Sequence, residues 1–176
     1  MNESGQKKPK EFRVQTELIV ASSAIFVSLA TLFVYVYQAK IMQSQLHASV
    51  WPYLEWGTTN YQKFEIIVQN KGIGPALVKN VQMKIDGKKI SGYAELLDSL
   101  FGKKRQKYFF ITSYLNRRVL AAGEIVKPIQ VEDSLFATKI DSALRIHNFE
   151  LEICYCSIYN DCWKTNGLEV VESDCK

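Results

Sequence analysis

The chain has 176 residues, of which 47% are hydrophobic, and its net charge at pH 7 is +4. This total is too small to indicate a class of partner, so only the distribution of charge is informative. The length leaves about 125 residues from Trp51 onward, which suits one packed domain and excludes an array of several.

The first 13 residues are polar, and we expect them to form a disordered tail. The tail carries four cations: Lys7, Lys8, Lys10 and Arg13. Lys40 is the one cation that closely follows the apolar segment described next. Because cationic flanks tend to stay in the cytoplasm, this asymmetry favours a cytoplasmic N-terminus and a soluble domain on the other side of the membrane.

Residues 18 to 37 read LIVASSAIFVSLATLFVYVY, without a charge, a proline or a glycine. A helix needs about 20 such residues to cross a hydrocarbon core of about 30 Å. A secretory signal peptide is the alternative, but Tyr35, Tyr37 and Lys40 make a poor cleavage site, and tyrosines suit the membrane interface. We therefore predict an uncleaved anchor in a transmembrane and juxtamembrane helix over residues 14 to 50.

One face of this helix carries small or polar residues at spacings of three and four. Lipid-facing positions favour bulky apolar side chains, whereas helix–helix contacts favour small ones. The pattern therefore predicts self-association, with a polar path lined by Ser28 and Thr31 as a further hypothesis. A monomeric anchor is the alternative. The predicted association or pore face consists of Ala21, Ala24, Ser28, Thr31, Tyr35 and Gln38.

Residues 51 to 176 predict a mainly antiparallel β domain. Asp86-Gly87 is a two-residue hairpin signal, and residues 70 to 75 are a turn cluster. Short strands with regular turns favour an Ig-like sandwich or a small barrel after the single transmembrane α-helix. Short helices are expected at 93–101 and 134–145. The expected strands are 64–69, 77–85, 108–115, 125–131, 149–159, 162–165 and 168–171.

A run of cations beside aromatic residues follows the first of these short helices. Cations next to exposed aromatics suit contact with phosphates combined with base stacking, and they equally suit anionic lipid headgroups. The third interpretation is a solvated loop that leads into a strand. The candidate ligand-binding residues are Lys103, Lys104, Arg105, Lys107, Tyr108, Arg117 and Arg118.

The four cysteines give no obvious disulfide pair. Cys154 and Cys156 share a strand face and point in parallel, a poor geometry for bonding each other. If Asn160-Asp161 forms a two-residue hairpin, Cys162 lies on the opposite face. Cys175 lies close to the end of the sequence. This arrangement favours a reducing compartment, against the charge asymmetry, and its spacing does not predict a metal site.

Catalytic motifs are not recognisable in the sequence. The two histidines, His47 and His147, lie far apart, and the chain lacks G-x-S-x-G, P-loop, H-E-x-x-H and G-x-G-x-x-G patterns. We therefore predict a protein that is not an enzyme and has no cofactor.

Three stretches, WPYLEW, NKGIGPALVKNV and ICYCSIYNDCW, resemble a widespread class of small bacterial proteins with one N-terminal membrane helix and a β domain. The layout is also similar to single-pass membrane effectors of anti-phage defence, including Hailong-like and other nucleotide-signalled types. This resemblance implies a homo-oligomer in the cell (inner) membrane, a nucleotide or single-stranded oligonucleotide ligand, and a nucleotidyltransferase encoded nearby. It also implies a cytosolic β domain.

The functional hypothesis is therefore a homo-oligomeric membrane effector or channel whose β domain senses a nucleotide or oligonucleotide. The alternative is a passive anchor that presents an extracytoplasmic protein-interaction module. The charge asymmetry favours the second, whereas the cysteines and the effector resemblance favour the first, so the sequence leaves the side of the membrane open.

Overall fold

The computed structural model describes residues 11–60, 62–102 and 109–175, with side chains described from Thr16 onward. The chain forms two compact units, residues 1–46 and residues 47–176. Most of the expected tail and the cationic run at 103–108 lie outside the described residues. Helix α1 spans Glu11–Ser49 and thus begins before residue 14, where we expected it to start.

Among the described residues, α1 is the one helix that is long and apolar enough to cross a membrane. Its large apolar side chains are exposed, as an apolar surrounding would allow. The hydroxyl groups of Ser22, Ser23, Ser28 and Thr31 each donate to a backbone carbonyl three or four residues earlier. The polar side chains in the middle of the apolar segment are therefore satisfied within the helix itself.

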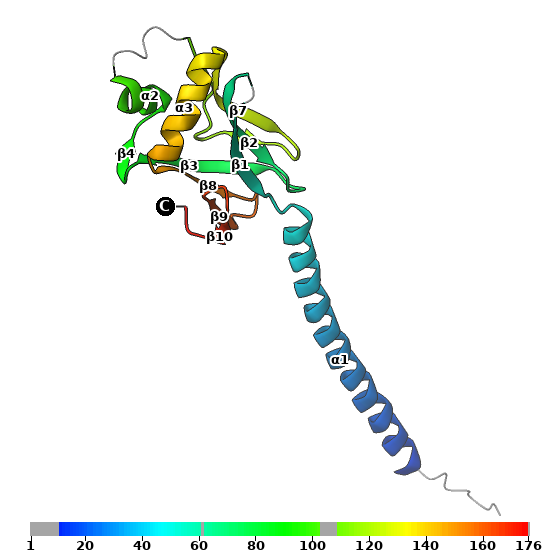
Figure 1. Cartoon of the computed structure of the whole chain (residues 1–176). Coiled ribbons are helices and arrows are strands. Elements are labelled where there is room, and N and C mark those ends of the chain that lie inside the picture. Colours follow the sequence, from blue (N-terminus) through cyan, green and yellow to red (C-terminus); the bar gives the residue numbers. More distant parts are fainter. Residues whose placement is uncertain (1–10, 61, 103–108, 176) are drawn as a thin grey trace, which may run out of the picture. The chain divides into compact units, whose positions relative to one another are not determined.

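The described part of the second unit contains two antiparallel sheets, which confirms the predicted helix followed by a β domain (Figure 1). The first sheet has the order β1 (Leu54–Thr59), β2 (Phe64–Asn70), β7 (Ile125–Val131), β5 (Ile111–Thr112). The second has the order β10 (Val170–Glu172), β9 (Cys162–Thr165), β8 (Phe149–Cys156), β3 (Ala76–Ile85), β4 (Lys88–Ile90), and β6 (Val119–Leu120) also pairs with β3.

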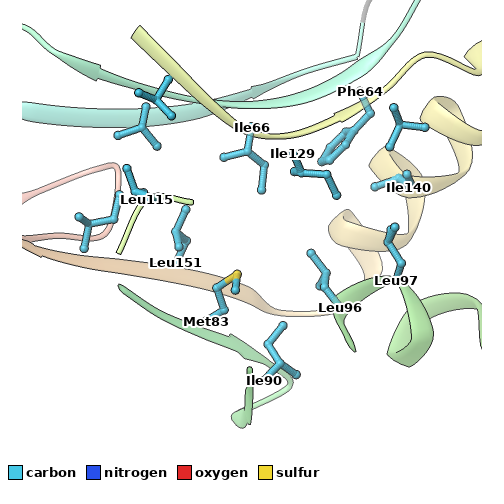
Figure 2. Close-up of a cluster of buried hydrophobic side chains, with 14 of the residues drawn as sticks. Phe64, Ile66, Met83, Ile90, Leu96, Leu97, Leu115, Ile129, Ile140 and Leu151 are labelled. Atoms are coloured by element: carbon cyan, nitrogen blue, oxygen red, sulfur yellow. The ribbon is translucent and has the colours of Figure 1, made fainter. Parts of the chain in front are cut away.

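The hydrophobic core receives side chains from both sheets (Figure 2). Ile66 and Ile129 come from the first sheet, and Met83 and Leu151 from the second. Two helices, α2 (Tyr93–Phe101) and α3 (Ser134–Ile146), add Leu96, Leu97 and Ile140 to the same core. In β2 every second residue from Ile66 to Asn70 is buried, and in β8 Leu151 and Ile153 are buried on either side of the less buried Glu152, because successive side chains of a strand point to opposite faces.

Local signals in the sequence explain several boundaries. Asp86 and Gly87 both have positive φ, as the type I′ turn of a two-residue hairpin requires, and they join β3 to β4 as predicted. Asp133 caps α3, because its side chain accepts a hydrogen bond of 2.7 Å from the Phe136 backbone N–H. Of the strand expected over 108–115, the described residues 109–115 contain the two residues of β5.

The turn between β2 and β3 packs its backbone against residues 50–53. A β-carbon at Gly72 would collide with Tyr53 and Trp51, and one at Gly74 would collide with the Val50 carbonyl. Asn70 is fully buried at this turn and donates to the carbonyls of Gly74 (2.8 Å) and Leu120 (3.1 Å). The stretch NKGIGP therefore has a structural role, since it fixes the first residues of the β unit to its turn.

Candidate functional site

The candidate ligand residues fall into two groups. Lys103, Lys104, Arg105, Lys107 and Tyr108 lie outside the described residues. Arg117 and Arg118 are described and lie in the loop between β5 and β6, where both side chains are exposed. The described part of the predicted cationic site is therefore the loop that carries these two arginines.

The two arginines line a pocket of about 290 Å³ together with Lys79 of β3. Lys79 sits where the pairing of β3 with β8 slips between Val78 and Asn80, so it occupies a β-bulge. Arg117 has a φ of 59°, a left-handed conformation that is unusual for a residue with a side chain. The Val78 backbone N–H donates to the Arg118 carbonyl (2.8 Å), which holds the loop against the bulge. Bulges and positive φ values often reorient side chains at binding sites.

The three cations of this pocket differ in whether they already pair with a carboxylate. Arg118 forms an ion pair of 3.0 Å with Glu124. Among the residues that the structure describes, Lys79 and Arg117 form no ion pair. Backbone and arginine hydrogen bonds also hold the pKa of the Glu124 carboxyl below its usual value, so Glu124 stays ionised beside Arg118. The pocket can therefore offer Lys79 and Arg117 to an anion, in a solvent-exposed setting where salt screens the attraction. Sequence reasoning missed Lys79, because a bulge gives no clear signal in a single sequence.

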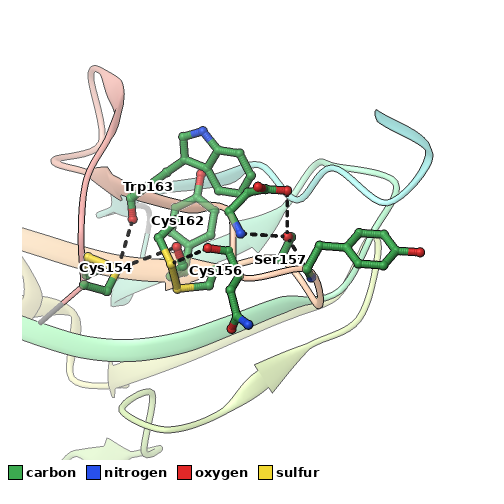
Figure 3. The surroundings of a disulfide bond; sticks show 10 residues. Cys154, Cys156, Ser157, Cys162 and Trp163 are labelled. Atoms are coloured by element: carbon green, nitrogen blue, oxygen red, sulfur yellow. Dashed lines mark hydrogen bonds between the residues drawn. A yellow bond between two sulfur atoms is a disulfide. The ribbon is translucent and has the colours of Figure 1, made fainter. Parts of the chain in front are cut away.

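The expectation that no cysteine pair forms a disulfide is wrong. All four cysteines lie within the described residues and are bonded, as Cys154–Cys175 and Cys156–Cys162 (Figure 3). The cysteines therefore give no support to a reducing compartment, which removes the residue-based argument for a cytosolic domain.

The error comes from the length of the loop between β8 and β9. Residues 157–161 form a five-residue loop rather than a two-residue hairpin, so Cys162 pairs directly with Cys156. Ser157 organises this loop: its backbone N–H donates to the Asp161 carbonyl (2.8 Å), and its hydroxyl accepts from the backbone N–H of Tyr159 (3.1 Å) and of Asp161 (3.2 Å). The longer loop places Cys162 on the face that Cys154 and Cys156 share.

The last described residues lie next to the two disulfides. The Ser173 backbone N–H donates to the Cys162 carbonyl (3.0 Å), next to the bonded Cys175. The sulfur atoms of Cys156, Cys162 and Cys175 lie within 4.8 Å of one another. Since these sulfurs are bonded in disulfides, they could act as metal ligands only after reduction.

A larger cavity, of about 570 Å³, lies beside the cystines and is acidic. Asp161 and Glu172 line it, together with His47. The His47 Nδ1 atom lies 2.8 Å from an Asp161 carboxylate oxygen, and the imidazole stacks on the Tyr159 ring with centroids 4.6 Å apart. Its negative charge makes this cavity a poor site for a phosphate, and His47 has structural contacts here rather than a catalytic arrangement.

The second histidine also has a structural partner. The His147 Nδ1 atom lies 2.7 Å from an Asp86 carboxylate oxygen, at the hairpin between β3 and β4. This hydrogen bond, with a second from the Asn148 backbone N–H, holds the pKa of the Asp86 carboxyl below its usual value. Among the described residues, the two histidines thus lie in separate places, and neither is joined to a nucleophile.

The predicted association face lies on α1, where all six side chains are exposed. The Ser28 and Thr31 hydroxyls donate to the carbonyls of Ala24 and Val27, both at 2.7 Å. Neither hydroxyl therefore needs a hydrogen-bond partner on a second helix. Self-association stays a prediction that rests on the small side chains of this face.

No family model, curated protein or solved structure matches the chain. The resemblance to single-pass defence effectors therefore stays a prediction.

Proposed function

We propose that the protein is a non-enzymatic, single-pass membrane protein that presents its β sandwich as a binding module on the oxidising side of the cell membrane. The observation that carries this proposal is that all four cysteines, each within the described residues, form disulfides. Disulfides persist in oxidising compartments and are rare in the cytosol. The proposal therefore favours the extracytoplasmic alternative over a cytosolic sensor.

The charge asymmetry supports the same topology by an independent route. Lys7, Lys8, Lys10 and Arg13 precede the apolar segment, and Lys40 alone follows it closely. Cationic flanks tend to remain in the cytoplasm, which leaves the residues after α1 outside. Two features of different physical origin, side-chain charge and sulfur chemistry, thus favour one orientation.

Two C-terminal fusions test this orientation in cells. Alkaline phosphatase fused after Lys176 becomes active only when it is exported, whereas green fluorescent protein fused at the same point becomes fluorescent in the cytosol. We expect phosphatase activity without fluorescence. Alkylation of the untagged chain under non-reducing conditions should find no free thiol. A fluorescent fusion, together with four alkylated thiols, would contradict the proposal.

The second candidate is a homo-oligomeric membrane effector or channel, with a cytosolic β domain that senses a nucleotide or oligonucleotide in anti-phage defence. The pocket of Lys79 and Arg117 favours it, because two cations without a carboxylate partner among the described residues suit a phosphate. In this case a nucleotide would bias the arrangement of the β units and thereby the helices. The same fusions separate the two candidates, since this one requires fluorescence.

A further inference from the structure

We propose that Cys156, Cys162 and Cys175 form a thiol–disulfide exchange site, at which a dithiol partner opens one disulfide and Cys175 then changes its bonding partner. The three sulfur atoms lie within 4.8 Å of one another. In the structure they belong to two separate disulfides, Cys154–Cys175 and Cys156–Cys162. The site requires these disulfides but not a particular side of the membrane, so its test is separate from that of the topology.

Each disulfide joins an inner cysteine to an outer one. The inner cysteines, Cys154 and Cys156 of β8, are almost completely buried. Cys162 lies opposite Cys156 on β9 (Figure 3), and both Cys162 and Cys175 are partly exposed. Exchange begins when a thiolate attacks a sulfur atom that it can reach. The outer cysteines are therefore the ones at which an incoming thiol reacts first.

The cavity of about 570 Å³ beside the disulfides gives access to Cys162. This residue lines the cavity together with Trp163 and Ser173. Its sulfur lies 3.3 Å from the Asn160 carbonyl oxygen, in a contact that is exposed to solvent. The Cys162 sulfur is therefore the point at which the partner enters.

The first step opens the disulfide between β8 and β9. A thiolate of the partner attacks the Cys162 sulfur, a bond forms between these two sulfurs, and the Cys156–Cys162 bond breaks. The electron pair of the broken bond stays on Cys156, which becomes a thiolate. This thiolate is already close to Cys175, because their sulfur atoms lie within 4.8 Å of each other.

The second step moves the other disulfide. The Cys156 thiolate attacks the Cys175 sulfur, so the Cys156–Cys175 bond forms and the Cys154–Cys175 bond breaks. Cys154 takes the electron pair and then a proton. The second thiolate of the partner attacks the partner sulfur bound to Cys162, which releases Cys162 as a thiolate that is also protonated. The partner has lost two hydrogen atoms to become a disulfide, and the chain has gained them as thiols on Cys154 and Cys162.

The charges around the point of entry indicate which thiol fits. Asp161, Glu172 and Asp174 line the cavity with His47, and the described lining contains no Lys or Arg. An acidic cavity attracts a thiol that lies beside a positive charge and repels an anionic one such as glutathione. The partner is therefore a dithiol flanked by cations.

Disulfide mapping after limited reduction tests the exchange. Full-length oxidised protein in mild detergent receives one equivalent of dithiothreitol, is quenched with acid and is digested with pepsin at low pH, where too little thiolate remains for exchange. Tandem mass spectrometry of the cross-linked peptides should find molecules whose single disulfide is Cys156–Cys175. The pairs Cys154–Cys156 and Cys154–Cys162 should be absent from the folded protein and appear only in urea. Native pairs alone, or Cys154 paired with Cys156 or Cys162 in the folded protein, would overturn the proposal.

Single variants test the exchange without a reductant. Cys162→Ser leaves a thiol on Cys156, and attack on Cys175 should share this thiol with Cys154. N-ethylmaleimide in excess, added with denaturant, should therefore label both residues, in the same proportion at two protein concentrations. Cys175→Ser is the matched control, because it removes the shared sulfur, and its thiol should stay on Cys154. Labelling of Cys156 alone in Cys162→Ser would contradict the exchange.

Two small thiols test the route of entry. Cysteamine is cationic and mercaptopropionate is anionic, and mass spectrometry follows the mixed disulfide that each forms on Cys162. The ratio of the cysteamine rate to the mercaptopropionate rate should be at least about threefold higher at low salt than at high salt. Glu172→Gln should reduce this effect, whereas Glu169→Gln, exposed outside the cavity lining, should not. A ratio that does not change with salt would exclude entry through the acidic cavity and overturn the proposal.

Discussion

Glu65 illustrates how single side chains stabilise the β unit. It is almost completely buried in β2, and three polar partners surround its carboxylate: Lys63 (2.8 Å), Lys127 (3.1 Å) and Gln130 (3.1 Å). Burial alone would raise the pKa of this carboxyl, but hydrogen bonds and charges from the two lysines outweigh burial and lower it. The ionised form of Glu65 is therefore more stable in the folded chain than in the unfolded chain.

This lowered pKa predicts a pH dependence of stability. A carboxyl with a lower pKa in the folded state stabilises the protein above its unfolded pKa, near 4.3, and loses that contribution as the pH falls through the folded value. At pH 7 we expect Glu65→Gln to lower the free energy of unfolding by about 1–3 kcal/mol, because it removes charged hydrogen bonds. The difference from the wild type should shrink below about pH 4. Urea unfolding followed by tryptophan fluorescence measures both.

Glu55→Gln is the control for this prediction. Glu55 pairs with Lys71 at 2.6 Å, but both side chains are well exposed, so the change should cost less than about 1 kcal/mol. An equal loss in the two variants, or a Glu65→Gln loss that does not depend on pH, would contradict the role given to Glu65.

At the scale of elements, the predictable features were those with a local cause. The alternation in Phe149, Leu151 and Ile153 identifies β8, and Asp86-Gly87 identifies a hairpin, because each depends only on neighbouring residues. The loop from Ser157 to Asp161 was misjudged because its length is set by side-chain hydrogen bonds from Ser157. The bulge at Lys79 depends on the pairing of β3 with β8, distant in sequence, and was therefore missed.

The two disulfides should differ in their effect on stability. Cys154–Cys175 joins residues 21 apart in sequence, whereas Cys156–Cys162 joins residues 6 apart. Since a longer closed loop restricts the unfolded chain more, we expect replacement of the first pair by serine to cost about 3 kcal/mol and of the second about 2 kcal/mol. Urea denaturation of the two double variants under oxidising conditions tests this order. A reversed order would indicate that native contacts, rather than loop closure, dominate.

Whether the predicted face of α1 mediates self-association can be tested by enlarging its small side chains. Ala24→Leu with Ser28→Leu should prevent close approach of helices and reduce the oligomer mass in mild detergent, measured by analytical ultracentrifugation. Phe26→Leu lies on another face and is the matched control. If the double variant and the control give the same mass as the wild type, this face does not mediate association. If the assembly conducts, the double variant should also fail to depolarise cells that express it.

At the scale of the whole molecule, the described residues divide into an apolar helix and a disulfide-bonded β unit with different demands on their surroundings. The helix could be predicted from length and composition, since a span of this kind needs only about 20 apolar residues. The cationic pocket could not be predicted, because Lys79 and Arg117 come together only after the strands pair. The fold class was thus predictable, and the arrangement of the candidate sites was not.

The cationic pocket predicts salt-dependent binding of a single-stranded oligonucleotide. If Lys79 and Arg117 each contact one phosphate, the affinity should fall by roughly 1.4 log units per log unit of salt, or 0.7 per contact. Lys79→Gln with Arg117→Gln should weaken binding and leave folding intact, because exposed charges contribute little stability. Fluorescence anisotropy with a short labelled strand and the full-length protein measures the affinity at two salt concentrations.

Arg118→Gln is the matched control for the pocket. Arg118 already pairs with Glu124, so its loss should weaken binding less than the loss of Arg117. A separate variant with Gln at Lys103, Lys104, Arg105 and Lys107 tests the predicted run outside the described residues. Failure to bind at low salt, or unchanged binding in the Lys79 and Arg117 variant, would reject a phosphate role for the pocket.

The close approach of Gly72 and Gly74 to residues 50–53 has a consequence for how such chains diverge in evolution. A side chain at either glycine would meet backbone atoms, which cannot rotate away, whereas Ile73 between them is exposed. Drift should therefore erase Ile73 readily while it leaves the two glycines and the buried Asn70 in place. A saturation mutagenesis library would show this as alternating tolerance along five residues. The pattern N-x-G-x-G, downstream of a Trp-Pro that follows an apolar helix, is thus a signature for finding distant relatives whose overall identity has been lost.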